Sequence, residues 1–149
     1  MIKKYKIGFN IGGLVLFLVI MIPNFYWFAI PAPNDILRAD SITESLDIIA
    51  SVFQVLMIIF LCTLINKDSR KMTFSPLIIT TIISCFLYFV FWILYYKSIT
   101  NTVVVLGLCI FPCVAFLFFA TDRKNIIAVI SIFIFMFCHL IYGIANFIL

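Results

Sequence analysis

Charged residues are scarce in this sequence, because only 11% of its 149 residues are Asp, Glu, Lys or Arg, against about 25% in a typical soluble domain. Hydrophobic residues make up 66% of the chain, and the mean hydropathy is +1.28. This balance excludes a soluble globular protein. It also excludes functions that need a separate soluble module, such as a nucleotide-binding domain, a zinc ribbon or a soluble catalytic domain.

Long uncharged runs account for most of the chain. There are five, of 28, 19, 25, 24 and 25 residues, at 7–34, 48–66, 72–96, 98–121 and 125–149. A helix needs about 18–20 apolar residues to cross a hydrocarbon core of about 30 Å. We therefore predict an all-α integral membrane protein, a single transmembrane domain over residues 1–149 folded as a five-span helix bundle, with spans at about 7–30, 46–66, 75–96, 102–120 and 126–148.

The basic residues are concentrated on one side of the predicted membrane. Two lie on one side, Arg38 and Lys97, and eight on the other, Lys3, Lys4, Lys6, Lys67, Arg70, Lys71, Arg123 and Lys124. The positive-inside rule then predicts a multi-pass protein of the cytoplasmic membrane, with its N-terminus in the cytoplasm and its C-terminus outside. Basic residues scattered at span ends encode topology, so we predict the lipid bilayer and not nucleic acid as a partner. Four of the six acids fall on the external side: Asp35, Asp40, Glu44 and Asp47.

The cysteines do not form a recognisable framework. All five fall inside predicted spans, and an odd number argues against a set of disulfides. Cys109 and Cys113 share a helix face, but no Cys-x-x-Cys or His-x-x-x-His pattern accompanies them. We therefore predict that the cysteines pack as small apolar residues and that the chain binds no metal ion and no cofactor.

Prolines and capping residues predict local features of the first three spans. Pro23 frees a backbone carbonyl one turn earlier, and the amide of Asn24 can satisfy a freed backbone group. The segment Ser41-Ile-Thr-Glu44 has the pattern of a capping box and is predicted to open the second span. Pro76 is predicted to lie in the first turn of the third span.

Polar and aromatic residues recur at helical spacing on three spans. Spacings of three and four residues keep side chains on one helix face. The stripes are Glu44, Asp47, Ser51 and Gln54 on the second span, Thr81, Ser84, Tyr88, Trp92 and Tyr95 on the third, and His139, Tyr142 and Asn146 on the fifth. Taken alone, the aromatic residues at the end of the third span are interpreted as anchors at the membrane interface.

In the predicted orientation these polar residues gather in the outer half of the membrane, where such groups usually face the bundle interior. The pattern predicts an outward-facing pocket with carboxylates at its mouth, aromatic walls, and His139 and Gln54 near its floor. The pocket would bind, or help transport, a small cationic or amphipathic solute, and His139 near a carboxylate suits proton coupling. The candidate ligand-binding residues are Asn24, Glu44, Asp47, Ser51, Gln54, Tyr88, Trp92, His139, Tyr142 and Asn146.

Other functions remain open. The chain can instead be an accessory subunit of a membrane complex, in which the polar residues form hydrogen bonds that hold the helices together. A membrane-embedded enzyme would need a triad such as His139, Asp47 and Ser51, but no nucleophile elbow or zinc-binding helix accompanies them, so a non-enzymatic role is favoured. A homodimer contact is predicted at the small residues Gly8, Gly12 and Gly13.

The end of the first span has a characteristic sequence. Ile22-Pro23-Asn24-Phe25-Tyr26-Trp27 is followed by Pro31 and Pro33, which end the helix, and by Asn34-Asp35, which is typical of a turn. Over about 20 residues this segment resembles the first-helix end of a group of short multi-pass membrane proteins from low-GC bacteria. The resemblance implies a bacterial cytoplasmic membrane protein, and it carries over no activity, ligand or catalytic residue.

Overall fold

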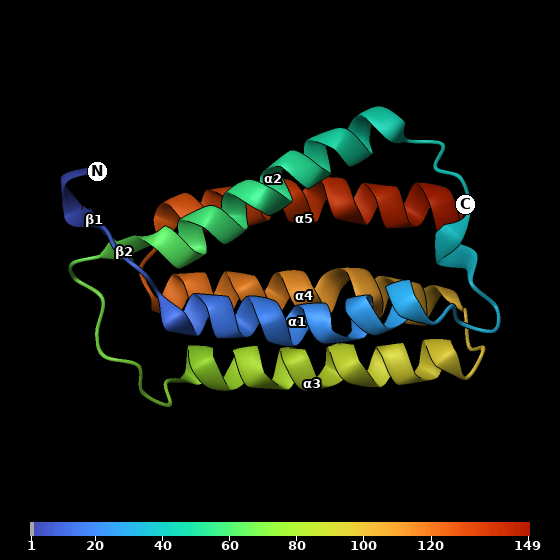
Figure 1. Ribbon diagram of the computed structural model, residues 1–149, viewed down its shortest axis with the longest axis horizontal. Coiled ribbons are helices and arrows are strands. Elements are labelled where there is room, and N and C mark those ends of the chain that lie inside the picture. Colours follow the sequence, from blue (N-terminus) through green and yellow to red (C-terminus); the bar gives the residue numbers. More distant parts are fainter. Residues whose placement is uncertain (1) are drawn as a thin grey trace.

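The computed structural model describes residues 2–149, and this part of the chain forms five long α-helices (Figure 1). They are α1 (Ile11–Ala29), α2 (Glu44–Thr63), α3 (Pro76–Tyr96), α4 (Thr102–Asp122) and α5 (Ile126–Phe147). Two 3-10 helices, η1 (Ile2–Lys4) and η2 (Ile36–Arg38), and two strands, β1 (Tyr5–Ile7) and β2 (Leu64–Asn66), complete the described elements. All five long helices are long and apolar enough to cross a membrane, which indicates a multi-pass membrane protein.

α1 begins later and α2 ends earlier than the predicted spans, because β1 and β2 pair as an antiparallel sheet beside them. α1 begins four residues after the predicted start of its span, and α2 ends three residues before the predicted end. Next to the sheet, the N–H groups of Gly8 and Asn10 donate to the carbonyls of Thr63 (2.9 Å) and Cys62 (2.7 Å). These bonds satisfy carbonyl groups that have no partner within the last turn of α2.

The starts of α2 and α3 differ in how well the sequence predicts them. α3 begins at Pro76, and Ser75 Oγ accepts a backbone N–H of the first turn at 3.2 Å, so the predicted proline position is confirmed. The predicted capping box is wrong, because α2 begins at Glu44 with Thr43 as its N-cap. Ser41 Oγ instead accepts the N–H of Thr43 at 3.1 Å, which forms a turn before the helix.

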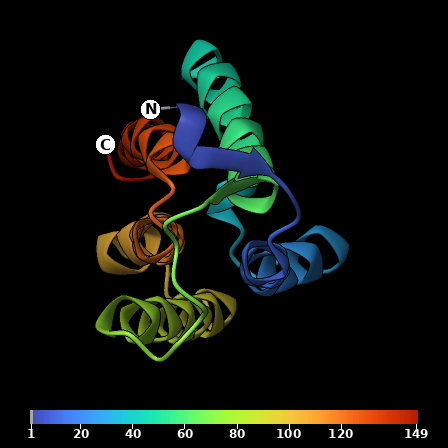
Figure 2. The same cartoon turned by 90° about the vertical axis from the view of Figure 1, so that its left-hand side faces the viewer.

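The helices surround a common interior when the bundle is viewed end-on (Figure 2). The largest interfaces join α3 to α4, α4 to α5 and α5 to α2, and α1 packs less extensively against α2, α3 and α4. α1 and α2 approach closely at one end, where a Cβ on Gly13 would lie 2.8 Å from the carbonyl oxygen of Leu61. Towards the other end α2 diverges from α1 and stays against α5 (Figure 1).

Charged residues lie mainly at the two ends of the bundle. We call the end formed by residues 2–10, 64–75 and 123–125 the basic end, and the end formed by residues 30–43, 97–101 and 148–149 the Asp35 end. The basic end carries eight of the ten Lys and Arg residues, and the Asp35 end carries Arg38 and Lys97. That the basic end faces the cytoplasm stays a prediction from the positive-inside rule.

The polar and aromatic stripe of α3 forms the buried face of that helix. All five of its members are buried. Trp92 is 5% exposed and Tyr95 is 0% exposed. The interpretation of these two residues as membrane-interface anchors is therefore wrong, because their rings face the inside of the bundle and not the lipid.

The three glycines predicted as a homodimer contact lie against residues of the same chain. An added Cβ would meet the Ile65 side chain at Gly8, the Phe119 ring at Gly12 and the Leu61 backbone at Gly13. Their small size therefore serves packing within the chain. The homodimer itself stays a prediction.

Candidate functional site

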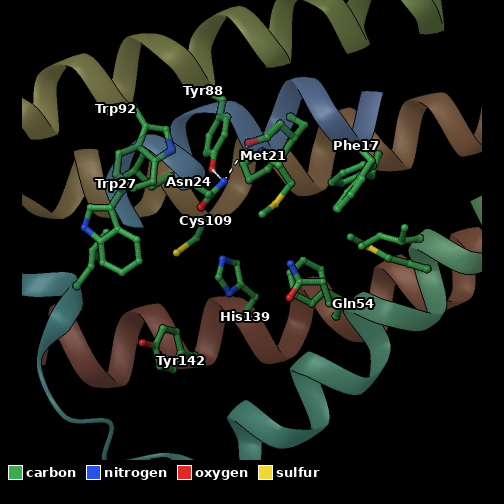
Figure 3. Close-up of a pocket in the computed structure, with 18 of the residues that line it drawn as sticks. Phe17, Met21, Asn24, Trp27, Gln54, Tyr88, Trp92, Cys109, His139 and Tyr142 are labelled. Atoms are coloured by element: carbon green, nitrogen blue, oxygen red, sulfur yellow. Dashed lines mark hydrogen bonds between the residues drawn. The ribbon is translucent and has the colours of Figure 1, made fainter. Parts of the chain in front are cut away.

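A cavity of about 270 Å³ extends between the five helices from the middle of the bundle towards the Asp35 end (Figure 3). The part nearer the basic end has apolar walls, which include Phe17, Met57 and Phe116. The structure brings six of the ten predicted ligand-binding residues together around the cavity: Asn24, Gln54, Tyr88, Trp92, His139 and Tyr142.

The accessible side of the cavity lies between α1 and α2. The residues that α3 and α4 contribute to the wall, such as Trp92 and Cys109, are buried. On α1 and α2, Met21 and Gln54 are half-buried, whereas Ile20 and Met57 are buried. The half-buried wall residues lie on α1 and α2, the two helices that diverge towards the Asp35 end (Figure 1).

Asn24 ties the kinked end of α1 to α3. Its Nδ2 donates to the carbonyl of Ile20 at 3.0 Å and to the hydroxyl of Tyr88 at 2.8 Å. The bonded carbonyl is that of Ile20 and not that of Val19, four residues before Pro23, so the predicted bond to the carbonyl freed by the proline is not formed. Both Nδ2 hydrogens are used in this way, which leaves Oδ1 of Asn24 and the hydroxyl hydrogen of Tyr88 for other partners.

The other polar groups around the cavity lack protein partners. The indole Nε1 of Trp92 is buried, and it has no hydrogen-bond partner within residues 2–149. In the same part of the chain the side chains of Gln54, His139 and Tyr142 make no hydrogen bond, and Figure 3 shows them on the opposite side of the cavity from Tyr88 and Trp92. The wall therefore offers unused donors and acceptors.

His139 belongs to an aromatic wall. Its ring stacks with Phe135, at 5.0 Å between centroids and 16° between planes, and with Tyr142, at 6.1 Å and 10°. Within the described chain it forms no ion pair with Asp47, so the carboxylate partner needed for proton coupling is not in contact. The three rings form a stacked aromatic column along α5 beside the cavity.

The remaining predicted site residues do not line the cavity. Glu44 and Ser51 are exposed, so a triad of Ser51 with His139 is not assembled. Asp47 accepts a hydrogen bond from the Thr43 hydroxyl at 3.2 Å. Asn146 bridges α5 to the start of α2, because its Oδ1 accepts from the N–H of Ile42 (2.7 Å) and its Nδ2 donates to the Thr43 hydroxyl (2.8 Å).

The absence of the acids changes the chemistry of the site. Among the described residues no Asp, Glu, Lys or Arg side chain lines the cavity. The predicted mouth of carboxylates is therefore not formed, because the half of α2 nearer the Asp35 end packs on α5 and diverges from α1. A wall of aromatic, aliphatic and neutral polar groups favours an uncharged ligand over a cation.

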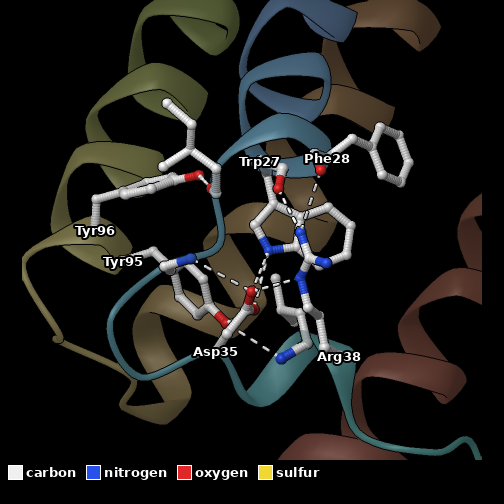
Figure 4. A network of polar contacts seen from close by, with 9 residues as sticks. Trp27, Phe28, Asp35, Arg38, Tyr95 and Tyr96 are labelled. Atoms are coloured by element: carbon white, nitrogen blue, oxygen red, sulfur yellow. Dashed lines mark hydrogen bonds and ion pairs between the residues drawn. The ribbon is translucent and has the colours of Figure 1, made fainter.

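A polar network that the sequence does not reveal closes the Asp35 end of the cavity (Figure 4). The carboxylate of Asp35 accepts hydrogen bonds from Trp27 Nε1 (2.9 Å), from the Tyr95 hydroxyl (2.8 Å) and from Arg38 Nε (2.8 Å). Arg38 also lies over the Trp27 ring, 4.8 Å from its centroid. Trp27 and Leu37 line the cavity, so this network joins the loop after α1 to the wall of the site.

The pKa of Asp35 lies below its ordinary value of 3.8. Burial raises the pKa of this carboxyl, but hydrogen bonds from Trp27, Tyr95 and Arg38 together lower it by more. The three-residue spacing of Asp35 and Arg38 was a visible signal for an ion pair. No signal in a single sequence connects Asp35 to Tyr95, which lies 60 residues away.

Asn125 holds the basic end together. Its side chain is buried, with Nδ2 donating to the carbonyls of Phe60 (2.9 Å) and Leu64 (3.0 Å). Its Oδ1 accepts the N–H of Ala128 at 3.1 Å and so caps α5. One amide therefore joins the start of α5 to the end of α2.

Comparison of the chain with protein-family models, with curated proteins and with solved structures gives no match. Residues 2–149 also contain no group of three or more His, Cys, Asp or Glu side chains placed to hold a metal ion. The chemistry of the cavity therefore has to be inferred from its own residues.

Proposed function

We propose that this chain is a small multi-pass protein of a bacterial cytoplasmic membrane, and that it binds an amphipathic molecule in the cavity between its five helices. The observation that carries the proposal is the cavity itself, with neutral polar groups around its middle and apolar walls nearer the basic end. A ligand with a polar head and an aliphatic part matches this division.

The accessible side of the cavity supports entry from the lipid phase. The half-buried wall residues Met21 and Gln54 lie on α1 and α2, which diverge towards the Asp35 end. An amphipathic molecule dissolved in the bilayer reaches this side without crossing water. With the basic end in the cytoplasm, as the positive-inside rule predicts, the site lies in the outer half of the membrane.

The size of the cavity supports a small occupant. An apolar cavity of about 150 Å³ holds benzene, so about 270 Å³ is enough for a polar head and part of a chain. The rest of a longer chain would extend between α1 and α2 into the lipid. If the protein helps to transport its ligand, a second copy or a partner subunit would complete the path.

A melting experiment in detergent tests this function. Dodecanol, dodecylammonium and tetraethylammonium are added separately, and the neutral amphiphile is expected to stabilise most. At roughly 100 times its Kd a ligand stabilises by about 2.7 kcal/mol, which raises Tm by roughly 5–10 °C in a chain of this size. Stabilisation by tetraethylammonium alone would instead favour a cation site.

Two neighbouring positions on α1 provide a matched control. Met21→Trp places a larger ring in the cavity wall, and it is expected to abolish the rise in Tm with dodecanol. Ile22→Trp makes a similar change at a side chain that is 54% exposed and faces away from the cavity. It is expected to preserve the response. Equal responses in both variants would argue against binding in the cavity.

A second candidate is an accessory subunit whose polar residues serve packing. The interhelical bonds of Asn24 and Asn146 favour it, because each ties two parts of the bundle together. Under this function none of the amphiphiles shifts Tm, and a partner membrane protein is recovered when the chain is purified from its own membrane.

A further inference from the structure

The buried indole N–H of Trp92 is the least satisfied polar group of the described chain. The side chain is 5% exposed and lines the cavity, and its Nε1 has no hydrogen-bond partner within residues 2–149. Buried donors are nearly always paired in folded proteins, so each exception needs an explanation. An indole N–H can only donate, which means that its missing partner is an acceptor.

Tyr88 supplies a second donor beside Trp92. The two rings pack edge to face, 6.3 Å apart between centroids, and the Tyr88 oxygen accepts from Asn24. Because that oxygen already accepts a hydrogen bond, the hydroxyl hydrogen is free to donate elsewhere. In Figure 3 the indole nitrogen of Trp92 lies on the side that faces Tyr88 and Asn24. The indole N–H and the Tyr88 hydroxyl therefore belong to adjacent groups in the wall of the cavity.

We infer that the ligand of the proposed site has an uncharged head with an acceptor oxygen, of the carbonyl type, which binds between Trp92 Nε1 and the Tyr88 hydroxyl. This inference rests on the proposed function and specifies its ligand. The carbonyl oxygen has two lone pairs and so accepts from both donors at once. The stacked rings of Phe135, His139 and Tyr142 line the same cavity and add aromatic contacts around the head.

The same geometry disfavours an ammonium head. An ammonium group offers only donors, and it would place its charge beside two further donors in a cavity that no acidic side chain lines. The aliphatic part of the ligand lies along Phe17, Met57 and Phe116 towards the basic end. Quinones, ketones and esters of lipids all present a carbonyl oxygen of this kind. Probes that differ only in the head separate the contribution of the head from that of the aliphatic part.

Binding of four twelve-carbon compounds that differ in the head provides the test. The probes are 2-dodecanone, methyl undecanoate, dodecylammonium and dodecane, titrated into the protein in detergent and followed by tryptophan fluorescence. Trp27 and Trp92 are the two tryptophans of the chain, and both line the cavity. The ketone is expected to bind about tenfold more tightly than dodecane, which corresponds to ~1.4 kcal/mol, and dodecylammonium no more tightly than dodecane.

Trp92→Phe, which removes the indole N–H donor, is the matched variant. In Trp92→Phe the remaining Trp27 reports binding, and the preference for the ketone over dodecane is expected to disappear while dodecane still binds. Benzothienylalanine at position 92 keeps the bicyclic shape without the N–H and is expected to give the same loss, which separates the donor from packing. The same analogue provides a second measurement if Trp92→Phe fails to fold.

The outcomes distinguish the two proposals. If the ketone and dodecane bind equally in the unmodified protein, or if the preference survives without the N–H, the head assignment is wrong and the amphiphile site stands. If none of the four probes binds, the proposed function fails as well. If the ester binds tightly and the ketone does not, the acceptor is not a simple carbonyl shared by both, and the inference is overturned.

Discussion

Asp35→Ala is expected to lower the free energy of unfolding by about 3–4 kcal/mol, because it leaves several donors without their acceptor. Trp27 Nε1 and the Tyr95 hydroxyl both donate to this carboxylate, whose side chain is 11% exposed. The Arg38 side chain is 41% exposed, so its ion pair contributes little of the loss. The measurement is reversible unfolding in mixed micelles titrated with SDS.

Asp40→Ala is the matched control for this prediction. Asp40 lies in the same loop and is exposed, so its removal is expected to change the free energy of unfolding by no more than about 0.5 kcal/mol. A loss below about 1 kcal/mol for Asp35→Ala would show that the network does not hold the Asp35 end together.

The lowered pKa of Asp35 also predicts a dependence on pH. A carboxyl whose pKa is lower in the folded protein stabilises the fold above its ordinary pKa of 3.8, and this stabilisation is lost as pH falls through the folded-state value. Stability is therefore expected to fall with acid below about pH 4 and to fall less in Asp35→Asn. Identical acid profiles for both proteins would contradict the assignment.

Asn125→Ala is expected to cost about 3 kcal/mol, because one substitution removes a helix cap and two bonds between helices. The carbonyls of Phe60 and Leu64 at the end of α2 lose their shared donor in a buried position. The N–H of Ala128 loses its acceptor at the same time. The same unfolding titration in SDS measures the loss.

Asn101→Ala is the control that separates the loss of a helix cap from the loss of a bond between helices. The Asn101 side chain caps α4 by accepting the N–H of Val104 at 3.0 Å, and it is exposed and makes no bridge to another helix within the described chain. Asn101→Ala is therefore expected to cost only about 1 kcal/mol. If Asn125→Ala cost the same as Asn101→Ala, the bridge to α2 would contribute nothing measurable.

The membrane-spanning helices were predictable because the length and hydropathy of a segment are local properties of the sequence. Uncharged runs long enough to cross a bilayer are visible without knowing which helices touch, and all five correspond to helices of the structure. The ends were less predictable where a competing interaction is distant in the chain. β1 and β2 shorten two helices through pairing over about 60 residues, and Leu64 and Ile65 are apolar enough to be counted in a span.

The buried face of α3 was predictable for the same reason, since Tyr88 and Trp92 share a face by spacing alone. Spacing does not say what a face packs against. Glu44, Asp47, Ser51 and Gln54 share a stripe on α2, but only Gln54 lines the cavity, because the half of α2 nearer the Asp35 end diverges from α1 and packs on α5.

The Asp35 network lay beyond sequence analysis. Asp35 follows two prolines and an asparagine, which are typical of a turn, and its most buried partner, Tyr95, is on another helix. A single sequence contains no information on which loop folds back over which helix end. Its role in closing the cavity became visible only with the packing of α1 against α3.

The most direct test of the central proposal is native mass spectrometry of the chain purified from its own membrane in polymer-bounded discs and released into mild detergent. We expect the unmodified protein and Ile22→Trp to retain a neutral, carbonyl-containing amphiphile, and Met21→Trp to lose it. Equal retention in all three proteins, or no retained molecule in any of them, would contradict a ligand in the cavity between α1 and α2.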